Sequence, residues 1–141
     1  MNPSSESFHA SSVALDGRAV LITGPSGSGK SDLALRLLDR GFSLVSDDQT
    51  IVRRERERLL ASAPPQIAGK LEVRGIGIVD VDNVGDVPVA LIVELMSDME
   101  RLPDDRDRTL LGVPVPLVTI DAITASAPSK VALALDRLGL K

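Results

Sequence analysis

The segment Gly24-Pro-Ser-Gly-Ser-Gly-Lys-Ser31 matches the pattern G-x-x-x-x-G-K-[ST], which is typical of a triphosphate-binding P-loop. Glycines let the backbone turn its N–H groups towards phosphate oxygens without a side chain in the way. In such a loop the lysine reaches the β- and γ-phosphates, and the final hydroxyl coordinates Mg²⁺. The motif therefore predicts a site for ATP and Mg²⁺, with phosphate binding by Gly24, Pro25, Ser26, Gly27, Ser28, Gly29, Lys30 and Ser31.

An acidic pair, Asp47 and Asp48, follows the apolar stretch Phe42–Ser46. A P-loop protein needs a second acidic group for its magnesium site, usually at the end of another buried strand. Neighbouring side chains of an extended chain point in different directions, so one carboxylate can serve the metal and the other can accept the substrate proton. A helix N-cap or a surface turn is the alternative interpretation of the pair.

Three further residues are candidates for the same site. Glu72 can complete a magnesium shell, and Arg74 can neutralise charge on a transferred phosphoryl group. Spacing alone leaves a bulged strand with a surface ion pair as the alternative for this run, in which two glycines interrupt strand-like residues. His9 is the only histidine, and taken by itself it is typical of a surface position.

The elements that position these residues are predicted from local patterns. A turn at Asp16-Gly17 joins two extended runs, the glycine loop lies between a strand and a helix, and the charged run Arg53–Arg58 indicates a solvated hairpin. Residues 1–7 are predicted as a flexible tail, and 8–141 as a single α/β domain. The predicted strands are 18–23, 42–46, 87–95 and 117–120, a polar surface loop spans 97–108, and the helices are 30–40 and 129–138.

Composition excludes several classes of function. The chain has 141 residues and a net charge of −4, and its only aromatic residues are Phe8 and Phe42, so neither a basic surface nor a stacking platform for nucleic acid is expected. No apolar run is long enough for a membrane span, and the absence of cysteine excludes a disulfide framework. We expect a cytoplasmic enzyme or regulator without nucleic-acid or membrane partners.

Beyond these patterns, the sequence resembles the catalytic domain of the HPr kinase/phosphorylase family. Residues 24–48 are similar to the family's P-loop, its following helix and its D-D pair. Leu71-Glu-Val-Arg-Gly-Ile-Gly-Ile-Val-Asp-Val81 is similar to the family signature E-[IV]-R-G-[LI]-G-I-I-[DN]-V, and Phe8-His9 resembles the histidine that precedes the P-loop strand. The resemblance covers about residues 8–120 and indicates a short form with the C-terminal catalytic domain only.

The resemblance implies an ATP- and Mg²⁺-dependent kinase that phosphorylates a serine of an HPr-like phosphocarrier of the phosphotransferase system. It implies that Ser31 and Glu72 bind magnesium, and that the pair Asp47-Asp48 takes the serine proton, with Asp48 favoured. It further implies that His9 assists near the acidic pair and that Arg74 lies in the segment that the family uses for both directions of the reaction. The implied fold is a P-loop mixed sheet flanked by helices, similar to the phosphoenolpyruvate carboxykinase core, and the family often forms homo-oligomers.

One segment departs from the family pattern. Longer members carry P-V-R-P-G-R-N after the last core strand, whereas Ile120–Lys130 contains no arginine. That segment supplies a catalytic arginine linked to the phosphate-driven reverse reaction, and a lysine such as Lys130 lacks the planar fork of arginine. The sequence therefore favours the kinase over the phosphorylase. Two alternatives remain: a nucleotide-sensing module without phosphoryl transfer, and a small-molecule kinase with lid arginines between Arg101 and Arg108.

Overall fold

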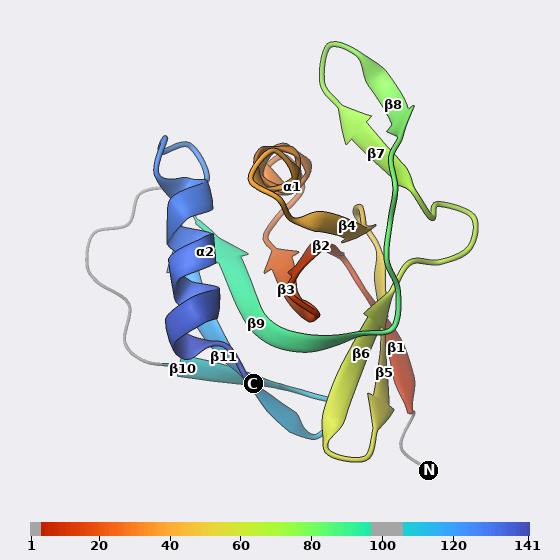
Figure 1. Ribbon diagram of the computed structural model, residues 1–141, viewed down its shortest axis with the longest axis vertical. Helices are drawn as coiled ribbons and strands as arrows, with labels where there is room; N and C mark the ends of the chain where they lie inside the picture. The colour runs from red at the N-terminus through yellow and green to blue at the C-terminus, as the bar shows by residue number, and fades with distance from the viewer. Residues whose placement is uncertain (1–3, 97–105) are drawn as a thin grey trace.

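The computed structural model describes residues 4–96 and 106–141 (Figure 1). Its main element is a curled mixed sheet in which seven strands follow one another in space, with β11 beside β9 and β10 beside β11. That order is β1 (Ser5–Phe8), β5 (Thr50–Glu55), β6 (Arg58–Ser62), β9 (Val87–Leu95), β3 (Arg18–Thr23), β2 (Ala10–Leu15) and β4 (Ser43–Ser46). The strands added beyond β9 are β10 (Arg106–Leu110) and β11 (Val113–Ile120).

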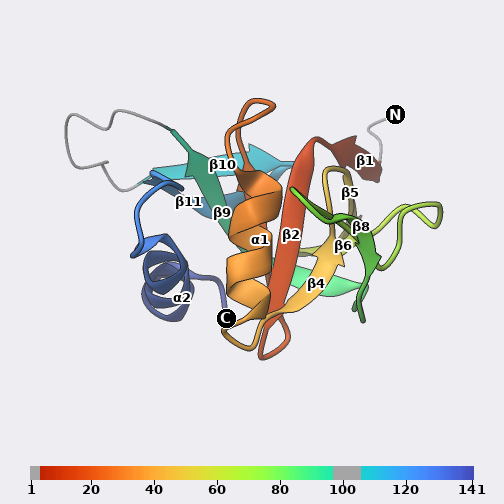
Figure 2. The ribbon, with the colours of Figure 1, turned by 90° about the horizontal axis from the view of Figure 1, so that it is seen from above.

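Two helices and a separate hairpin complete the described elements. The helices are α1 (Lys30–Leu38) and α2 (Ala127–Leu138). The hairpin consists of β7 (Lys70–Val73) and β8 (Gly77–Asp80), and it projects from the body of the molecule (Figure 1). Viewed from above, α1 lies along β2 (Figure 2).

Strand direction brings five chain positions to one edge of the sheet. The strands β3, β9 and β11 run parallel to one another. The strand β2 is antiparallel to β3, with Ala10 opposite Thr23, and β4 is antiparallel to β2, with Ser12 opposite Ser46. The carboxyl ends of β3, β4, β9 and β11 and the first residues of β2 therefore share an edge, which is where parallel α/β sheets bind ligands.

Aliphatic side chains fill both faces of the sheet. On one face the two helices cover β2, β3 and β9 with buried residues that include Leu33 and Leu37 of α1 and Leu135 of α2. On the other face the hairpin β5–β6 and the pair β10–β11 cover the same strands, with Leu59 and Val115 in the interior. Each fully buried side chain of this size contributes about 1.5–3 kcal/mol. This packing fixes the position of the shared edge.

The local predictions are largely confirmed. The turn at Asp16-Gly17 joins β2 to β3, the glycine loop joins β3 to α1, and Gly41 takes a left-handed φ of 94° after the helix. The run Arg53–Arg58 forms the hairpin β5–β6. A mixed sheet with helices is also the predicted fold class, although both helices cover the same face.

Two predictions and one alternative interpretation need correction. Residues 5–7 are not part of a tail, because they form β1 with Phe8 and pair with β5 through backbone groups. The glycine-containing run after Glu72 is a hairpin and not a bulged strand, since Gly75 and Gly77 have φ of 88° and 113° and the Ile76 N–H donates to the Val73 carbonyl at 3.0 Å. The predicted surface loop includes 106–108, but Arg106 begins β10. Its remaining residues, 97–105, lie outside the described ones.

Candidate active site

The loop between β3 and α1 has the geometry of a phosphate cradle. Gly27 and Gly29 have left-handed φ of 81° and 101°, which side chains with a Cβ rarely adopt. At Gly24, whose φ is 153°, a Cβ would lie 2.7 Å from the Ser28 hydroxyl oxygen and 3.2 Å from the Cβ of Leu95, which disfavours a side chain there. Because Gly29 occupies the N-cap position without a capping side chain, the first N–H groups of α1 remain available for an anion.

Lys30 supplies positive charge inside this loop. The side chain is 6% exposed, and its Nζ donates to the carbonyls of Gly24 at 2.8 Å and Pro25 at 3.1 Å. An ammonium group held among loop carbonyls is placed to attract phosphate oxygens. Together with the uncovered helix N-terminus, it makes the loop suitable for a polyphosphate.

Asp47 is the buried member of the acidic pair and is 6% exposed. Its Oδ1 accepts hydrogen bonds from the Ser31 hydroxyl at 2.6 Å and from the Ser11 hydroxyl at 2.8 Å. Its Oδ2 accepts from the backbone N–H of Glu72 at 3.0 Å. Three donors compensate the burial of this carboxylate and orient it towards the P-loop serine.

Asp48 points the other way, as predicted, although the pair lies in a bend beyond the end of β4 and strand alternation is not the cause. Its side chain is 64% exposed, and its Oδ1 lies 2.8 Å from Nε2 of His9. A carboxylate only accepts, so Nε2 carries the shared hydrogen. The backbone N–H of Asp48 donates to the Ser11 hydroxyl at 3.1 Å, and its φ of 70° is uncommon for a residue other than glycine. The strained backbone is fixed by Ser11 and presents the carboxylate at the surface.

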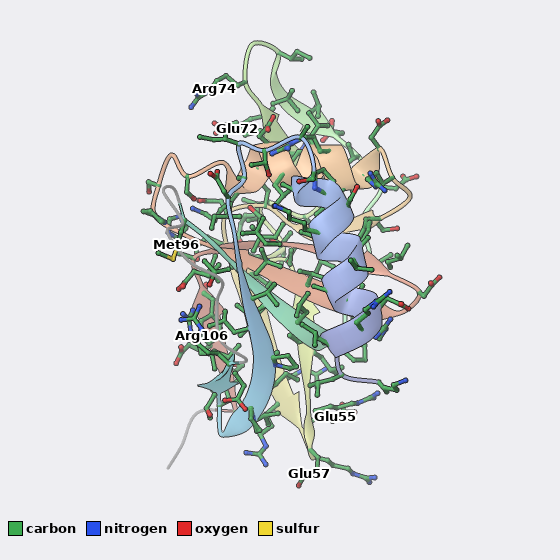
Figure 3. All side chains as sticks on the ribbon, turned by 90° about the vertical axis from the view of Figure 1, so that its left-hand side faces the viewer. Glu55, Glu57, Glu72, Arg74, Met96 and Arg106 are labelled. Carbon is green, nitrogen blue, oxygen red and sulfur yellow. The ribbon has the colours of Figure 1, made fainter. Side chains whose placement is uncertain are left out.

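These groups share one pocket of about 570 Å³. It contains His9, Asp48, Glu72 and Arg74 in addition to much of the glycine loop, although Gly24, Pro25 and Ser28 do not line it. Figure 3 shows Glu72 and Arg74 at the same end of the molecule. The lining residues are His9, Ser26, Gly27, Gly29, Lys30, Ser31, Asp32, Leu35, Asp47, Asp48, Glu72, Val73 and Arg74.

The predicted magnesium ligands are placed differently from each other. Among the described residues, no three His, Cys, Asp or Glu side chains are grouped to hold a metal ion. Ser31 lies against Asp47, whereas Glu72 meets Asp47 through its backbone and exposes its side chain. Mg²⁺ usually takes one or two protein oxygens and keeps several waters, so the hydroxyl and carboxylate of Ser31 and Asp47 fit this ion. The role of Glu72 stays a prediction.

Sequence reasoning missed Ser11. It is fully buried and links both aspartates, since it donates to Asp47 and accepts from the Asp48 backbone. The available signal was its spacing of two residues from His9, which in a continuous strand would place both side chains on one face, although His9 lies in the bend before β2. The pairing with β4 could not be read from that spacing.

The arginines expected over a small substrate are engaged elsewhere. Arg108 donates to Glu94 at 2.6 Å, and Arg106 donates to the hydroxyl of Thr119. Neither arginine lines the pocket, and Arg101 lies outside the described residues. These contacts give the small-molecule alternative no support. Within the described residues, no helix is sufficiently long and apolar to span a membrane.

A glycine loop that leads from a strand of a mixed sheet into a helix defines this chain as a P-loop protein of the α/β class. The chain belongs to the family described as the HPr Serine kinase C-terminal domain, whose model matches residues 3–133. This result confirms the resemblance drawn from the two sequence signatures.

Individual relatives agree with this assignment. The chain is 42% identical over 130 residues to an HPr kinase/phosphorylase of Chlorobium limicola, with 82% of this chain and 39% of the relative covered. The corresponding protein of Latilactobacillus sakei is 39% identical over 128 residues, with 81% and 41% covered. The chain therefore spans about two fifths of the length of these curated relatives.

A solved structure gives the same result for the fold. The chain is similar to the Hpr(Ser) kinase/phosphatase from Coxiella burnetii, with a TM-score of 0.82 and 30% identity. The match covers 93% of this chain and 94% of that chain. The mixed sheet with its two helices is thus the fold of that protein.

Proposed function

We propose that the protein is a cytoplasmic ATP- and Mg²⁺-dependent kinase that phosphorylates a serine of an HPr-like phosphocarrier. The observation that carries the proposal is the different placement of the two aspartates. Asp47 is hydrogen-bonded to the P-loop residue Ser31, while Asp48 faces the pocket beside His9. Family membership and the names of the relatives support the class of reaction.

The loop residues Gly24–Ser31 bind and orient the triphosphate of ATP in this proposal, with Lys30 as the fixed cation. Ser31 and Asp47 would hold Mg²⁺, and Glu72 would be a further ligand. When bound, the ion neutralises negative charge on the phosphate oxygens. Asp47 is suited to this role because its burial and three hydrogen bonds leave it a single orientation.

Asp48 is the proposed general base. It takes the proton of the carrier's serine hydroxyl while the hydroxyl oxygen bonds to the terminal phosphorus of ATP and ADP leaves. The exposed carboxylate can be reached by a protein substrate, and the hydrogen bond from His9 orients it. Arg74, at the turn of the projecting hairpin, lies where it can meet the transferred group or the carrier.

The reverse reaction is not part of the proposal. The loop that follows β11 lies against the P-loop, since a Cβ on Gly29 would be 3.4 Å from that of Ala122, but this loop provides no arginine. Lys130 lies exposed on α2 and does not line the pocket. Inorganic phosphate is therefore expected not to remove phosphate from the phosphorylated carrier.

Incubation with an HPr-like protein, Mg²⁺ and ATP labelled at the γ-phosphate tests the proposal. We expect one phosphate per carrier, on serine, and loss of transfer in Asp48→Asn. Glu57→Gln is the control. It neutralises a carboxylate at the end of the molecule opposite Glu72 and Arg74 (Figure 3) and is expected to retain transfer. Tight ATP binding without transfer to the carrier would instead favour a nucleotide-sensing module. Faster phosphorylation of a metabolite than of the carrier would favour a small-molecule kinase.

A further inference from the structure

Two exposed aliphatic side chains follow the strands on the far side of the glycine loop from the acidic pair. Met96 comes directly after β9 and is 47% exposed, and Ile123 follows β11 and is 85% exposed. The Met96 N–H donates to the Ile120 carbonyl at 3.1 Å, so the ends of the two strands are joined. The two residues therefore follow strand ends that lie side by side.

These strand ends adjoin both ends of the glycine loop. A Cβ on Gly24 would lie 3.2 Å from the Cβ of Leu95, the residue before Met96. A Cβ on Gly29 would lie 3.4 Å from the Cβ of Ala122, the residue before Ile123. The residues that come directly before Met96 and Ile123 are therefore in contact range of the loop. In Figure 3, Met96 lies between the end marked by Glu72 and Arg74 and the position of Arg106.

The position of Ile123 is fixed by its backbone and its neighbours. Its N–H donates to the carboxylate of Asp121 at 3.0 Å, and Arg36 of α1 donates to the carbonyls of Ala122 and Thr124. Ala122 itself is buried. The residues before and after Ile123 are thus hydrogen-bonded to α1, while the side chain of Ile123 remains exposed to solvent. A rigid, exposed aliphatic residue beside a phosphate cradle is suited to contact a ligand's apolar part.

Strand order determines which part of a nucleotide reaches these strand ends. The order β4-β2-β3-β9, with β11 beyond β9, places the acidic pair on one side of the glycine loop and Met96 and Ile123 on the other. The terminal phosphate must lie near Asp48 if phosphate is transferred there. The remainder of a triphosphate held by the loop then extends towards the ends of β9 and β11.

We infer that Met96 and Ile123 form the binding surface for the nucleoside of the nucleoside triphosphate, and that the base packs on aliphatic side chains. The inference rests on the proposed nucleotide binding and adds a site for the base. The two aromatic residues of the chain are not alternatives, because Phe42 is 5% exposed in the helix-side core and Phe8 packs against the opposite core. The surface accounts for binding of a nucleoside without aromatic stacking.

Fluorescence gives a direct test, because the chain contains no tryptophan. In Ile123→Trp, addition of ADP with Mg²⁺ is expected to change the emission of the single indole, whereas inorganic tripolyphosphate is not. Leu133→Trp, at an exposed position of α2, is the matched control and is expected to respond to neither ligand. Emission that responds to tripolyphosphate as strongly as to ADP would contradict a nucleoside contact.

Calorimetry provides the second measurement. Ile123→Ser should raise the Kd of ADP about fivefold by removing apolar contact area, and leave the Kd of tripolyphosphate unchanged. Leu133→Ser should alter neither constant. The inference is overturned if Ile123→Ser binds ADP with normal affinity and the indole emission of Ile123→Trp does not respond to ADP. That result leaves the proposed function intact. If the unmodified protein binds neither ADP nor tripolyphosphate, the proposed function fails and the inference fails with it.

Discussion

The two sides of the glycine loop differ in chemistry and in the way that they are built. On the side of β2 and β4 the chain presents His9, Asp47 and Asp48, connected through the buried hydroxyl of Ser11. We call this the acidic side. On the side of β9 and β11 it presents the exposed residues Met96 and Ile123, which we call the aliphatic side.

Strand direction explains the difference. The acidic side combines antiparallel neighbours, so the start of β2 meets the end of β4 and polar groups from distant parts of the sequence form hydrogen bonds. The aliphatic side consists of the ends of parallel strands, held to each other and to α1 through backbone carbonyls. A site that must move a proton needs fixed polar partners, whereas a site that holds a base needs a rigid apolar surface. The predictions below test this division.

The largest effect is expected on the acidic side. Asp48→Asn removes the proposed base while it keeps the size of the side chain, and transfer to the carrier should fall about 10³-fold. The Kd of ADP should stay within twofold of the original, because the amide is not part of the glycine loop. Quantitative transfer assays and calorimetry check this pair of results. Retention of more than a tenth of the original rate would show that another group takes the proton.

Ser11→Ala tests the positioning of the acidic pair. The variant leaves the buried carboxylate of Asp47 with one donor fewer and the Asp48 N–H without its acceptor. Loss of such partners costs about 1–3 kcal/mol in unfolding free energy, and transfer should fall about tenfold with a higher Mg²⁺ requirement. Urea unfolding and Mg²⁺ titration of the rate measure the two effects. Ser43→Ala, at an exposed position of β4, is the control; a stability loss without a changed Mg²⁺ requirement would limit Ser11 to a structural role.

A smaller effect is expected on the aliphatic side. Met96→Ser removes part of the surface proposed for the nucleoside, and we expect the Kd of ADP to rise about threefold. The Kd of tripolyphosphate should not change, because the serine lies outside the glycine loop. Titration calorimetry gives, for each ligand, the ratio of the Kd of the variant to that of the original protein. Equal weakening for both would mean that the substitution disturbs the loop and that the two sides are not independent.

The smallest effect is expected away from both sides, at Asp86. Hydrogen bonds from the Ser62 hydroxyl and then from Arg53 lower the pKa of this carboxyl. A lowered folded-state pKa contributes stability above the ordinary carboxyl pKa of about 3.9 that is lost as the pH falls through the folded-state value. In Asp86→Asn the free energy of unfolding should therefore decrease less as the pH falls in the acid range. The effect should be small, because exposed ion pairs are screened by solvent.

The measurement for Asp86→Asn is the urea midpoint at pH 7 and in steps below pH 5, with nucleotide affinity at pH 7 as the control. An unchanged affinity is expected because the residue lies outside the pocket. If the urea midpoint falls with pH in the same way as in the original protein, Ser62 and Arg53 do not measurably stabilise the ionised form of Asp86.

Two charged, strand-like runs show where sequence reasoning succeeds and fails. Arg53–Arg58 was predicted as a hairpin, and ion pairs of Glu55 with Arg53 and Arg58 close it locally. The pKa of Glu55 is lowered by hydrogen bonds from Arg58 and then Arg53. For the run from Glu72 to Asp80 spacing left a bulged strand as the alternative to a site segment, and the run is also a hairpin, because Gly75 and Gly77 take left-handed conformations. Figure 3 shows Glu55 and Glu72 at opposite ends of the molecule.

The error at the N-terminus has a similar cause. Residues 5–7 are polar and exposed, so no apolar pattern marks them as a strand. The strand β1 is stabilised by backbone pairing with β5, and the Arg54 N–H also donates to the Ser4 carbonyl at 2.7 Å. Backbone hydrogen bonds leave no signature in residue types, and an edge strand needs little else.

The sequence by itself determined the glycine loop, its strand and its helix, because the motif and the apolar periodicity act over a few neighbouring residues. It also predicted that Asp47 and Asp48 diverge, but they do so in the bend after β4, where Asp48 takes a left-handed φ of 70°, and not by the alternation of an extended strand. Only the tertiary structure decided which groups meet: Ser11 and His9 reach the aspartates, and Leu95 and Ala122, the residues before Met96 and Ile123, lie against the glycine loop. Strand order and direction arise from burial of the whole core on both faces of the sheet, and no local pattern specifies them.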